Sequence, residues 1–258
     1  MIRCVFRLAI VVLSSLFSQA GYCQSGNAVL IKGDTYIPLY GRDSSAVKVS
    51  DFTMDIYPVT HGEFLEFVKK FKNWQRSEVI QLFADGNYLL DWEVDTILGN
   101  KVSGKSPVTN ISWFAAKAYC DCQGKRLPTI DEWEYVAMAS ETMKDARQEK
   151  TFNQYILDWY ERPKQKKQEV GSTFKNYWGL YDIHGLVWEW TYDFNSVLIS
   201  GESRKDVDND SNLFCGSAAV GASDLMNYAA FMRYAIRGSL KANYAMRNLG
   251  FRCVKDVK

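Results

Sequence analysis

The chain has 258 residues, of which 47% are hydrophobic and 14% are aromatic. This length and composition fit one large domain or two small ones with a sizeable core, and they exclude a disordered chain. The 31 basic residues nearly balance the 30 acidic residues, so no long-range field would attract nucleic acid or an anionic membrane. Partners are therefore expected at local sites.

Residues 1–20 have the pattern of a secretory signal peptide. Two arginines precede an apolar run over residues 8–17, and Ser18-Gln19-Ala20 supplies a small-x-small cleavage site. The run is about half of the roughly 20 apolar residues that a spanning helix needs. We therefore expect cleavage after Ala20, no transmembrane segment in the mature chain, and a periplasmic or secreted location. A lipid anchor on Cys23 is an alternative, although a bulky tyrosine precedes it.

Five cysteines would remain after this cleavage, in a compartment where disulfides persist: Cys23, Cys120, Cys122, Cys215 and Cys253. An odd number leaves at least one without a partner in the same chain. One residue separates Cys120 from Cys122, whereas a redox C-x-x-C motif has two. The chain's two histidines, His61 and His184, are too few for a three-histidine metal site. The composition therefore does not favour redox-metal chemistry.

The first part of the mature chain predicts strands and then a helix. Ala28 to Pro38 and Val47 to Met54 have the alternation and β-branched content of strands. Thr60 is expected to cap an amphipathic helix over Gly62 to Phe71, where apolar residues recur at helical spacing. The following segment has mixed periodicity, and we expect it to be irregular with a short helix over Ser77 to Phe83.

Two further helices are predicted in the middle of the chain. Ser112 is expected to cap a helix that ends near Gly124, and Thr129 to cap another over Asp131 to about Ser140. The charged segment Glu141 to Glu169 predicts a solvated loop or a surface helix. From Gly171 onward, aromatic and glycine residues predict loops and short strands packed around aromatic side chains. With no repeat and no linker, one domain is the simplest interpretation.

Four groups of segments carry a resemblance to a known family: Ser106-Pro-Val-Thr-Asn-Ile-Ser-Trp113; Ala118-Tyr-Cys with Gly124-Lys-Arg-Leu-Pro-Thr129 and Glu132-Trp-Glu-Tyr135; Gly179-Leu-Tyr-Asp-Ile-His-Gly185 with Val187-Trp-Glu-Trp190; and Asn248-Leu-Gly-Phe-Arg-Cys253. Together, over residues 28–254, the chain resembles the formylglycine-generating enzyme, or sulfatase-modifying factor, family. The resemblance implies a loop-rich single domain of the α+β class, related to the C-type lectin fold. Known members include copper-dependent oxidases that convert a sulfatase cysteine to formylglycine, an iron-dependent branch, and proteins with no known reaction, so fold alone does not give the activity.

Two carboxylates lie on the glycine-containing loop from Asp182 to Glu189, and such a loop can wrap oxygen ligands around calcium. In the family this loop binds a structural calcium. The ligands implied here are the side chains of Asp182 and Glu189 with the carbonyls of Gly185 and Val187. The alternative is that both carboxylates accept hydrogen bonds from loop amides without a metal. A second calcium site of the family has no match in Gln148 to Pro163.

The resemblance also implies a disulfide between Cys120 and Cys253. Closing so long a loop would stabilise the fold by roughly 4 to 5 kcal/mol. The family's second structural bridge is missing, because its cysteines fall near Ala137 and Tyr234. A bridge between Cys122 and Cys215 is a hypothetical replacement.

The catalytic cysteines of the oxidase branch have no counterpart here. They follow a Gly-Gly-Ser turn, which corresponds to Cys215-Gly216-Ser217. Depending on the alignment, the two positions hold Val220 and Leu225 or Asp224 and Ala229, and none of these supplies the thiolate that Cu(I) prefers. We therefore expect no copper. A relocated pair, Cys122 with Cys215, and a thioether site at Met226 and Met232 remain alternatives.

A binding groove is expected to persist without the oxidation. In the family, a serine and a tryptophan beside the site help to hold substrate, and they correspond to Ser217 and Trp188; Cys215, two residues before Ser217, adjoins the same site. The chain is therefore predicted to be a catalytically degenerate exported protein that binds a peptide or assists the maturation of another exported protein. Two alternatives stay open: an active protein-modifying oxidase with a rearranged site, and a lectin-like ligand-binding protein.

Overall fold

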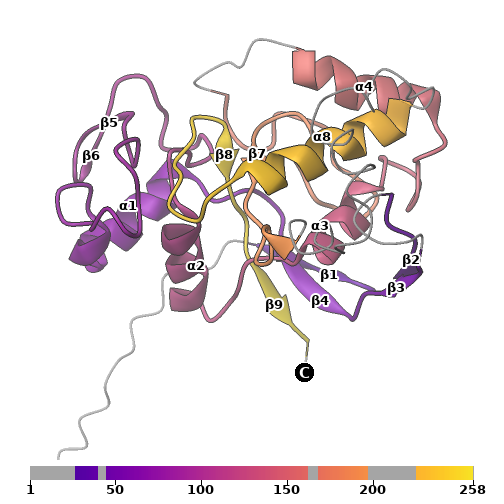
Figure 1. The fold of residues 1–258 in the computed structure, drawn as a ribbon, viewed down its shortest axis with the longest axis horizontal. Helices are drawn as coiled ribbons and strands as arrows, with labels where there is room; N and C mark the ends of the chain where they lie inside the picture. Colours follow the sequence, from indigo (N-terminus) through magenta and orange to yellow (C-terminus); the bar gives the residue numbers. More distant parts are fainter. Residues whose placement is uncertain (1–26, 40–44, 162–167, 197–224, 258) are drawn as a thin grey trace, which may run out of the picture.

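Strands from both ends of the chain form a three-stranded antiparallel sheet at the base of the molecule as drawn in Figure 1. The computed structural model describes residues 27–39, 45–161, 168–196 and 225–257. The central strand, β4 (Phe52–Asp55), pairs with β1 (Ala28–Ile31) on one side and with β9 (Val254–Asp256) on the other. This sheet therefore holds the beginning and the end of the described chain together.

The described residues also form three smaller sheets of two strands each. They are β2 (Thr35–Tyr36) with β3 (Val47–Lys48), β5 (Trp92–Val94) with β6 (Ile97–Leu98), and β7 (Trp188–Glu189) with β8 (Leu249–Gly250), the last pair being parallel. Each strand predicted near the N-terminus therefore splits into two. Gly33 lies at the first division, where a Cβ atom would come within 2.1 Å of the Val49 carbonyl oxygen. This close approach of two backbones requires glycine.

The three predicted helix starts are confirmed. α1 (His61–Lys70) and α3 (Ile130–Ala137) each begin with a capping box, formed by Thr60 with Glu63 and by Thr129 with Glu132. α2 (Trp113–Cys122) is capped by Ser112, whose hydroxyl accepts from the Ala115 amide. These hydrogen bonds satisfy amides that the helix itself leaves without acceptors, which is why the cap residues marked the starts in the sequence.

Other predictions need correction. The helix expected over residues 77–83 is wrong: that segment forms turns, and a 3₁₀ turn, η1 (Lys72–Trp74), precedes it. α3 ends at Ala137, three residues earlier than expected. In the charged segment, the surface-helix alternative is confirmed for α4 (Lys150–Glu161), whose apolar face, with Phe152, Ile156 and Trp159, is buried.

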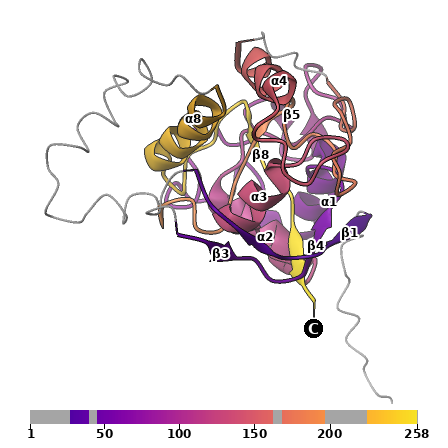
Figure 2. The ribbon, with the colours of Figure 1, turned by 90° about the vertical axis from the view of Figure 1, so that its right-hand side faces the viewer.

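A long helix was missed altogether. α8 (Leu225–Ser239) lies in the part of the chain for which loops and short strands were predicted. Figures 1 and 2 both show it beside α4, against which it packs. Its alanine, methionine and arginine residues are good helix formers. The sequence on either side is rich in glycine and asparagine, and this composition favoured the prediction of loops.

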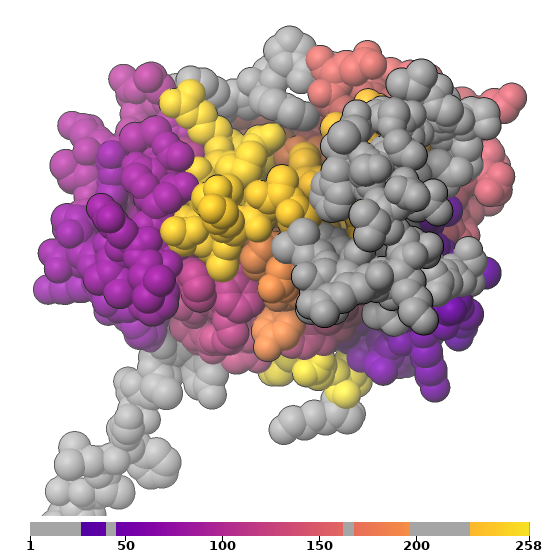
Figure 3. Space-filling model, viewed as in Figure 1, coloured from indigo at the N-terminus to yellow at the C-terminus, as the bar shows by residue number. Residues whose placement is uncertain are grey.

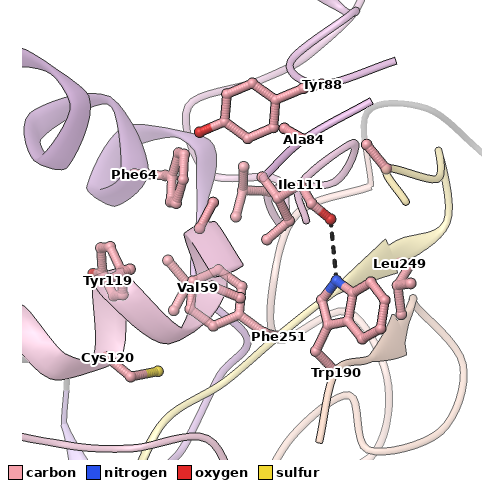
Figure 4. Close-up of a cluster of buried hydrophobic side chains, with 14 of the residues drawn as sticks. Val59, Phe64, Ala84, Tyr88, Ile111, Tyr119, Cys120, Trp190, Leu249 and Phe251 are labelled. Atoms are coloured by element: carbon pink, nitrogen blue, oxygen red, sulfur yellow. Dashed lines mark hydrogen bonds between the residues drawn. The ribbon is translucent and has the colours of Figure 1, made fainter. Parts of the chain in front are cut away.

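The main core lies between α1, α2 and the strands β7 and β8. Phe64, Tyr119 and Phe251 pack edge to face or stacked there, and the indole of Trp190 donates to the Ile111 carbonyl at 3.0 Å (Figure 4). A second cluster of buried side chains joins the three-stranded sheet to α3. Across the described ranges, none of the helices has the length and apolar character needed to cross a membrane.

Candidate functional site

The side chain of Trp188, in β7, lies against the end of α4. Its ring stacks on Tyr160 with centroids 5.0 Å apart and packs on Trp159 at 5.4 Å. The backbone amide of Trp188 donates to the Asn248 carbonyl at 2.8 Å, which fixes the strand. Trp188 is half-buried. Tyr160 therefore covers one face of the Trp188 ring, and α4 restricts access to that ring. α4 is formed by the segment in which the family's second calcium site had no match.

The other two pocket candidates, Ser217 and Cys215, lie outside the described residues, as do Val220 and Asp224. The structure therefore does not place them relative to Trp188. The later candidate position, Ala229, is described: it is buried in α8, and its carbonyl accepts from the Tyr160 hydroxyl at 3.3 Å. Neither the methyl group of Ala229 nor the hydroxyl group of Tyr160 is a soft metal ligand.

Glu134 of α3 forms ion pairs with two arginines of α8. Arg233 donates to both carboxylate oxygens at 2.8 to 3.2 Å, and Arg237 donates to one at 2.6 Å. Both guanidinium groups also lie over the Trp133 ring. Burial alone would raise the pKa of Glu134, but the two arginines outweigh it and lower the pKa to about 2. The ionised network therefore fixes α8 on α3.

Asp182, the first carboxylate of the expected calcium loop, accepts hydrogen bonds from other loop residues. It is fully buried and has the left-handed φ of 60° that aspartate tolerates better than most residues. Its oxygens accept from the backbone amides of Gly171 and Thr173 and from the Thr173 hydroxyl. Hydrogen bonds to loop amides are the contacts that the sequence offered as the alternative to calcium ligation.

Glu189, the second carboxylate, pairs with Arg252. The guanidinium donates to both carboxylate oxygens at distances from 2.7 to 3.0 Å, and the Trp133 indole donates to one of them at 2.9 Å. Both side chains of the ion pair are 0% exposed. These four hydrogen bonds use the acceptor sites that a carboxylate offers, and the guanidinium already supplies the compensating positive charge.

The residues around Asp182 and Glu189, as placed, do not fit a calcium ion. Their carboxylates are occupied by internal donors, and nowhere in the described ranges do three or more histidine, cysteine or acidic side chains gather at metal-binding distance. Gly185 is tightly packed, since a Cβ there would come within 2.8 Å of Thr173 and Tyr155 side-chain atoms. This arrangement argues against the calcium expected at Asp182, Gly185, Val187 and Glu189, and a metal measurement tests that expectation.

Cys120 and Cys253 form a disulfide that closes a loop of 133 residues and ties α2 to the segment before β9. This is the pair that the family resemblance implied. The hypothetical Cys122 to Cys215 bridge cannot be placed, because Cys215 is outside the described residues.

The fold and the motif positions are those of a formylglycine-generating-enzyme-like domain. The solved structure of CarF matches 91% of this chain and 99% of its own, with 18% identity and a TM-score of 0.50, which supports the fold. The family described as "Sulfatase-modifying factor enzyme 1-like domain" matches residues 14–257, so the chain belongs to that family. The domain expected over 28–254 lies within this match.

Relatives of both activity classes resemble the chain. The protein named inactive C-alpha-formylglycine-generating enzyme 2 from Bos taurus is 30% identical over 84% of this chain and 82% of its own length. The formylglycine-generating enzyme of Mus musculus is 27% identical over 81% of this chain and 67% of its own length. The family is thereby established, but these similarities alone do not decide between an active and an inactive protein.

Several residues at this site were not anticipated from the sequence. Arg252 belongs to the motif from Asn248 to Cys253, but its partner Glu189 lies 63 residues earlier in the sequence. Arg233 and Arg237 are four residues apart, a spacing that places both on one face of a helix, and this signal would have pointed to a shared acidic partner had α8 been recognised. Tyr160 gave no comparable signal.

Proposed function

We propose that this protein is a non-oxidising member of its family that binds an exported protein or peptide and assists its maturation or assembly. One observation carries the proposal: no cysteine follows Cys215 until Cys253, and Cys253 is bonded to Cys120. A pair of thiolates is what the copper-dependent members use to bind Cu(I), and this segment supplies no such pair. The family fold therefore persists here without the chemistry of the oxidases.

Structural features support a binding role. The disulfide, the buried Arg252 and Glu189 pair and the Glu134 network hold the domain rigidly, which lowers the entropic cost of ordering a binding surface. Trp188, the residue that the family resemblance assigns to substrate binding, is half-buried and so keeps part of its ring accessible. The expectation of an exported partner rests on the predicted signal peptide.

The decisive experiment is a conversion assay with binding measured in parallel. Mature protein, residues 21–258, is mixed with Cu(I), oxygen and a peptide that carries a sulfatase-type cysteine motif, and an active formylglycine-generating enzyme serves as the positive control. We expect no aldehyde product. Aldehyde that disappears in a Cys215→Ser variant would refute the proposal and establish the rearranged oxidase.

Binding is measured with fluorescent peptides from exported proteins and with a carbohydrate array. Peptide binding by the wild type that weakens in Trp188→Ala would support the proposed role. Trp74→Ala is the control, because Trp74 is an aromatic residue outside the site. Unchanged affinity in Trp188→Ala would remove Trp188 from the binding surface. Selective carbohydrate binding without peptide binding would favour the lectin-like alternative.

A further inference from the structure

A pocket of about 310 Å³ lies beside the first turn of α1, and we name it the His61 pocket. Its lining comes from segments that lie far apart in the sequence, and the polar residues in it include His61, Asp91, Lys101, Ser106, Arg247 and Asn248. Leu186 and Val187, which directly precede Trp188, also line it. Figure 3 shows the surface of the C-terminal segment (yellow) against that of the earlier segments (purple).

His61 contributes a hydrogen-bond donor to this pocket. Its Nδ1 accepts from the Trp92 indole at 2.9 Å. Burial lowers the pKa of His61 to about 4, so the imidazole is neutral at neutral pH and carries its proton on Nε2. No described residue accepts from Nε2. Because Nδ1 is occupied by Trp92, Nε2 is the ring atom left for a ligand.

Ser106 contributes a second group without a partner. The residue is 2% exposed, and its hydroxyl has no hydrogen-bond partner within the described part of the chain. Its carbonyl accepts from the His61 amide at 2.9 Å, which holds these two residues side by side. A buried hydroxyl left unpaired costs about 1 to 3 kcal/mol, so a bound acceptor that used it would recover stability.

The charged residues of the lining favour an anion. Lys101 and Arg247 are both exposed at the rim and form no ion pair with any described residue. Among the described residues that line the pocket, Asp91 is the one acidic residue, and it already accepts from the Asn110 amide group at 2.8 Å. Two positive charges against one negative charge, together with the donors of His61 and Asn248, suit a ligand that is negatively charged and rich in acceptors.

We propose that the His61 pocket binds a carboxylate, presented by the C-terminus or an acidic side chain of a peptide. Lys101 and Arg247 supply charge-assisted hydrogen bonds, His61 and Ser106 complete the donor set, and Leu186 with Val187 contact the adjoining aliphatic atoms. The choice of a peptide as the carrier rests on the proposed function, whereas the carboxylate assignment rests on the pocket itself.

The test uses the fact that the chain has two histidines. Nitrogen-15 correlation spectra of the imidazoles report His61 separately from His184, which is buried beside the Ala137 carbonyl and is the internal control. The probes are acetyl-trialanine with a free carboxylate, the same peptide as its amide, acetyl-Ala-Glu-Ala amide, and inorganic phosphate.

We expect the free acid or the glutamyl peptide to shift the His61 resonances in a saturable way, while the trialanine amide does not and His184 stays fixed. The two carboxylate probes distinguish a C-terminus from a side chain. Arg247→Ala should weaken binding about tenfold or more, because it removes a charge-assisted hydrogen bond. Lys255→Ala, which removes an exposed lysine of β9 outside the pocket, should leave the affinity unchanged.

The proposal is overturned if no carboxylate probe shifts His61, if the amide acts equally, if phosphate alone binds, or if Arg247→Ala binds as tightly as the wild type. Its failure is distinguishable from failure of the proposed function. Binding of an exported peptide without a His61 response would reject the pocket and keep the function. A His61 response to carboxylates without binding of any exported peptide would keep the pocket and reject the proposed function.

Discussion

Replacing Arg252 with methionine tests the buried ion pair that the structure places on the expected calcium loop. Arg252 and Glu189 are both 0% exposed, so the variant would leave the carboxylate buried without its positive partner. Breaking a buried pair in this way costs about 3 to 5 kcal/mol. The Arg252 guanidinium also donates to the carbonyls of Asp55, Ile56 and Tyr181, which would lose a donor. We therefore expect the upper half of this range.

Urea unfolding followed by circular dichroism, with the Cys120 to Cys253 disulfide intact, measures the change. Lys117→Met is the matched control, because Lys117 pairs with Asp121 on the exposed surface of α2. Loss of such a pair costs about 0.3 to 0.5 kcal/mol. The double variant Arg252→Met with Glu189→Leu should be less destabilised than Arg252→Met alone, since no buried charge remains.

Two results would refute this reasoning. A loss below about 1 kcal/mol for Arg252→Met would mean that Arg252 does not compensate the Glu189 charge. A double variant that is less stable than the single variant would mean that the loss comes from packing and not from the unpaired carboxylate.

Three further predictions follow from the described contacts. Chelation by EDTA should leave the melting temperature unchanged in differential scanning fluorimetry. A melting temperature that falls with EDTA and recovers with calcium would show that the protein does bind calcium. Replacing Cys120 and Cys253 with alanine should lower the free energy of unfolding by roughly 5 kcal/mol, from the 133-residue separation; a loss under about 1 kcal/mol would contradict a structural role. The depressed pKa of Glu134, about 2, means that its ionised form stabilises the fold above the ordinary carboxyl range and loses this effect as the pH falls towards 2. The stability gap between wild type and Glu134→Gln should therefore shrink as unfolding is measured at pH 6, 4 and 3, and a constant gap would contradict the assignment.

The features predicted well from the sequence are those with local causes. Thr60, Ser112 and Thr129 each accept from an amide three residues ahead, so a short stretch of sequence determines each helix start. The family motifs then implied the fold, and they implied the disulfide through positions far apart in the chain. Propensity alone would not have named either.

The parts that failed depend on contacts between distant segments. α8 is stabilised by Glu134, about a hundred residues earlier, and by packing on α4. The carboxylates of Asp182 and Glu189 suggested a cation by their spacing, but whether a carboxylate meets a metal or an arginine depends on which side chain folds beside it. For Glu189 that partner is Arg252. The His61 pocket likewise combines segments that lie far apart in the sequence, and no local pattern indicates it.

The most direct test of the account is Cu(I) binding by the mature protein, combined with a count of free thiols under conditions that keep the Cys120 to Cys253 disulfide. The account predicts that these two cysteines are oxidised and that no tight, stoichiometric copper is held. Tight copper on free thiols, lost in Cys215→Ser and accompanied by formylglycine formation, would contradict it and identify the protein as an oxidase with a relocated site.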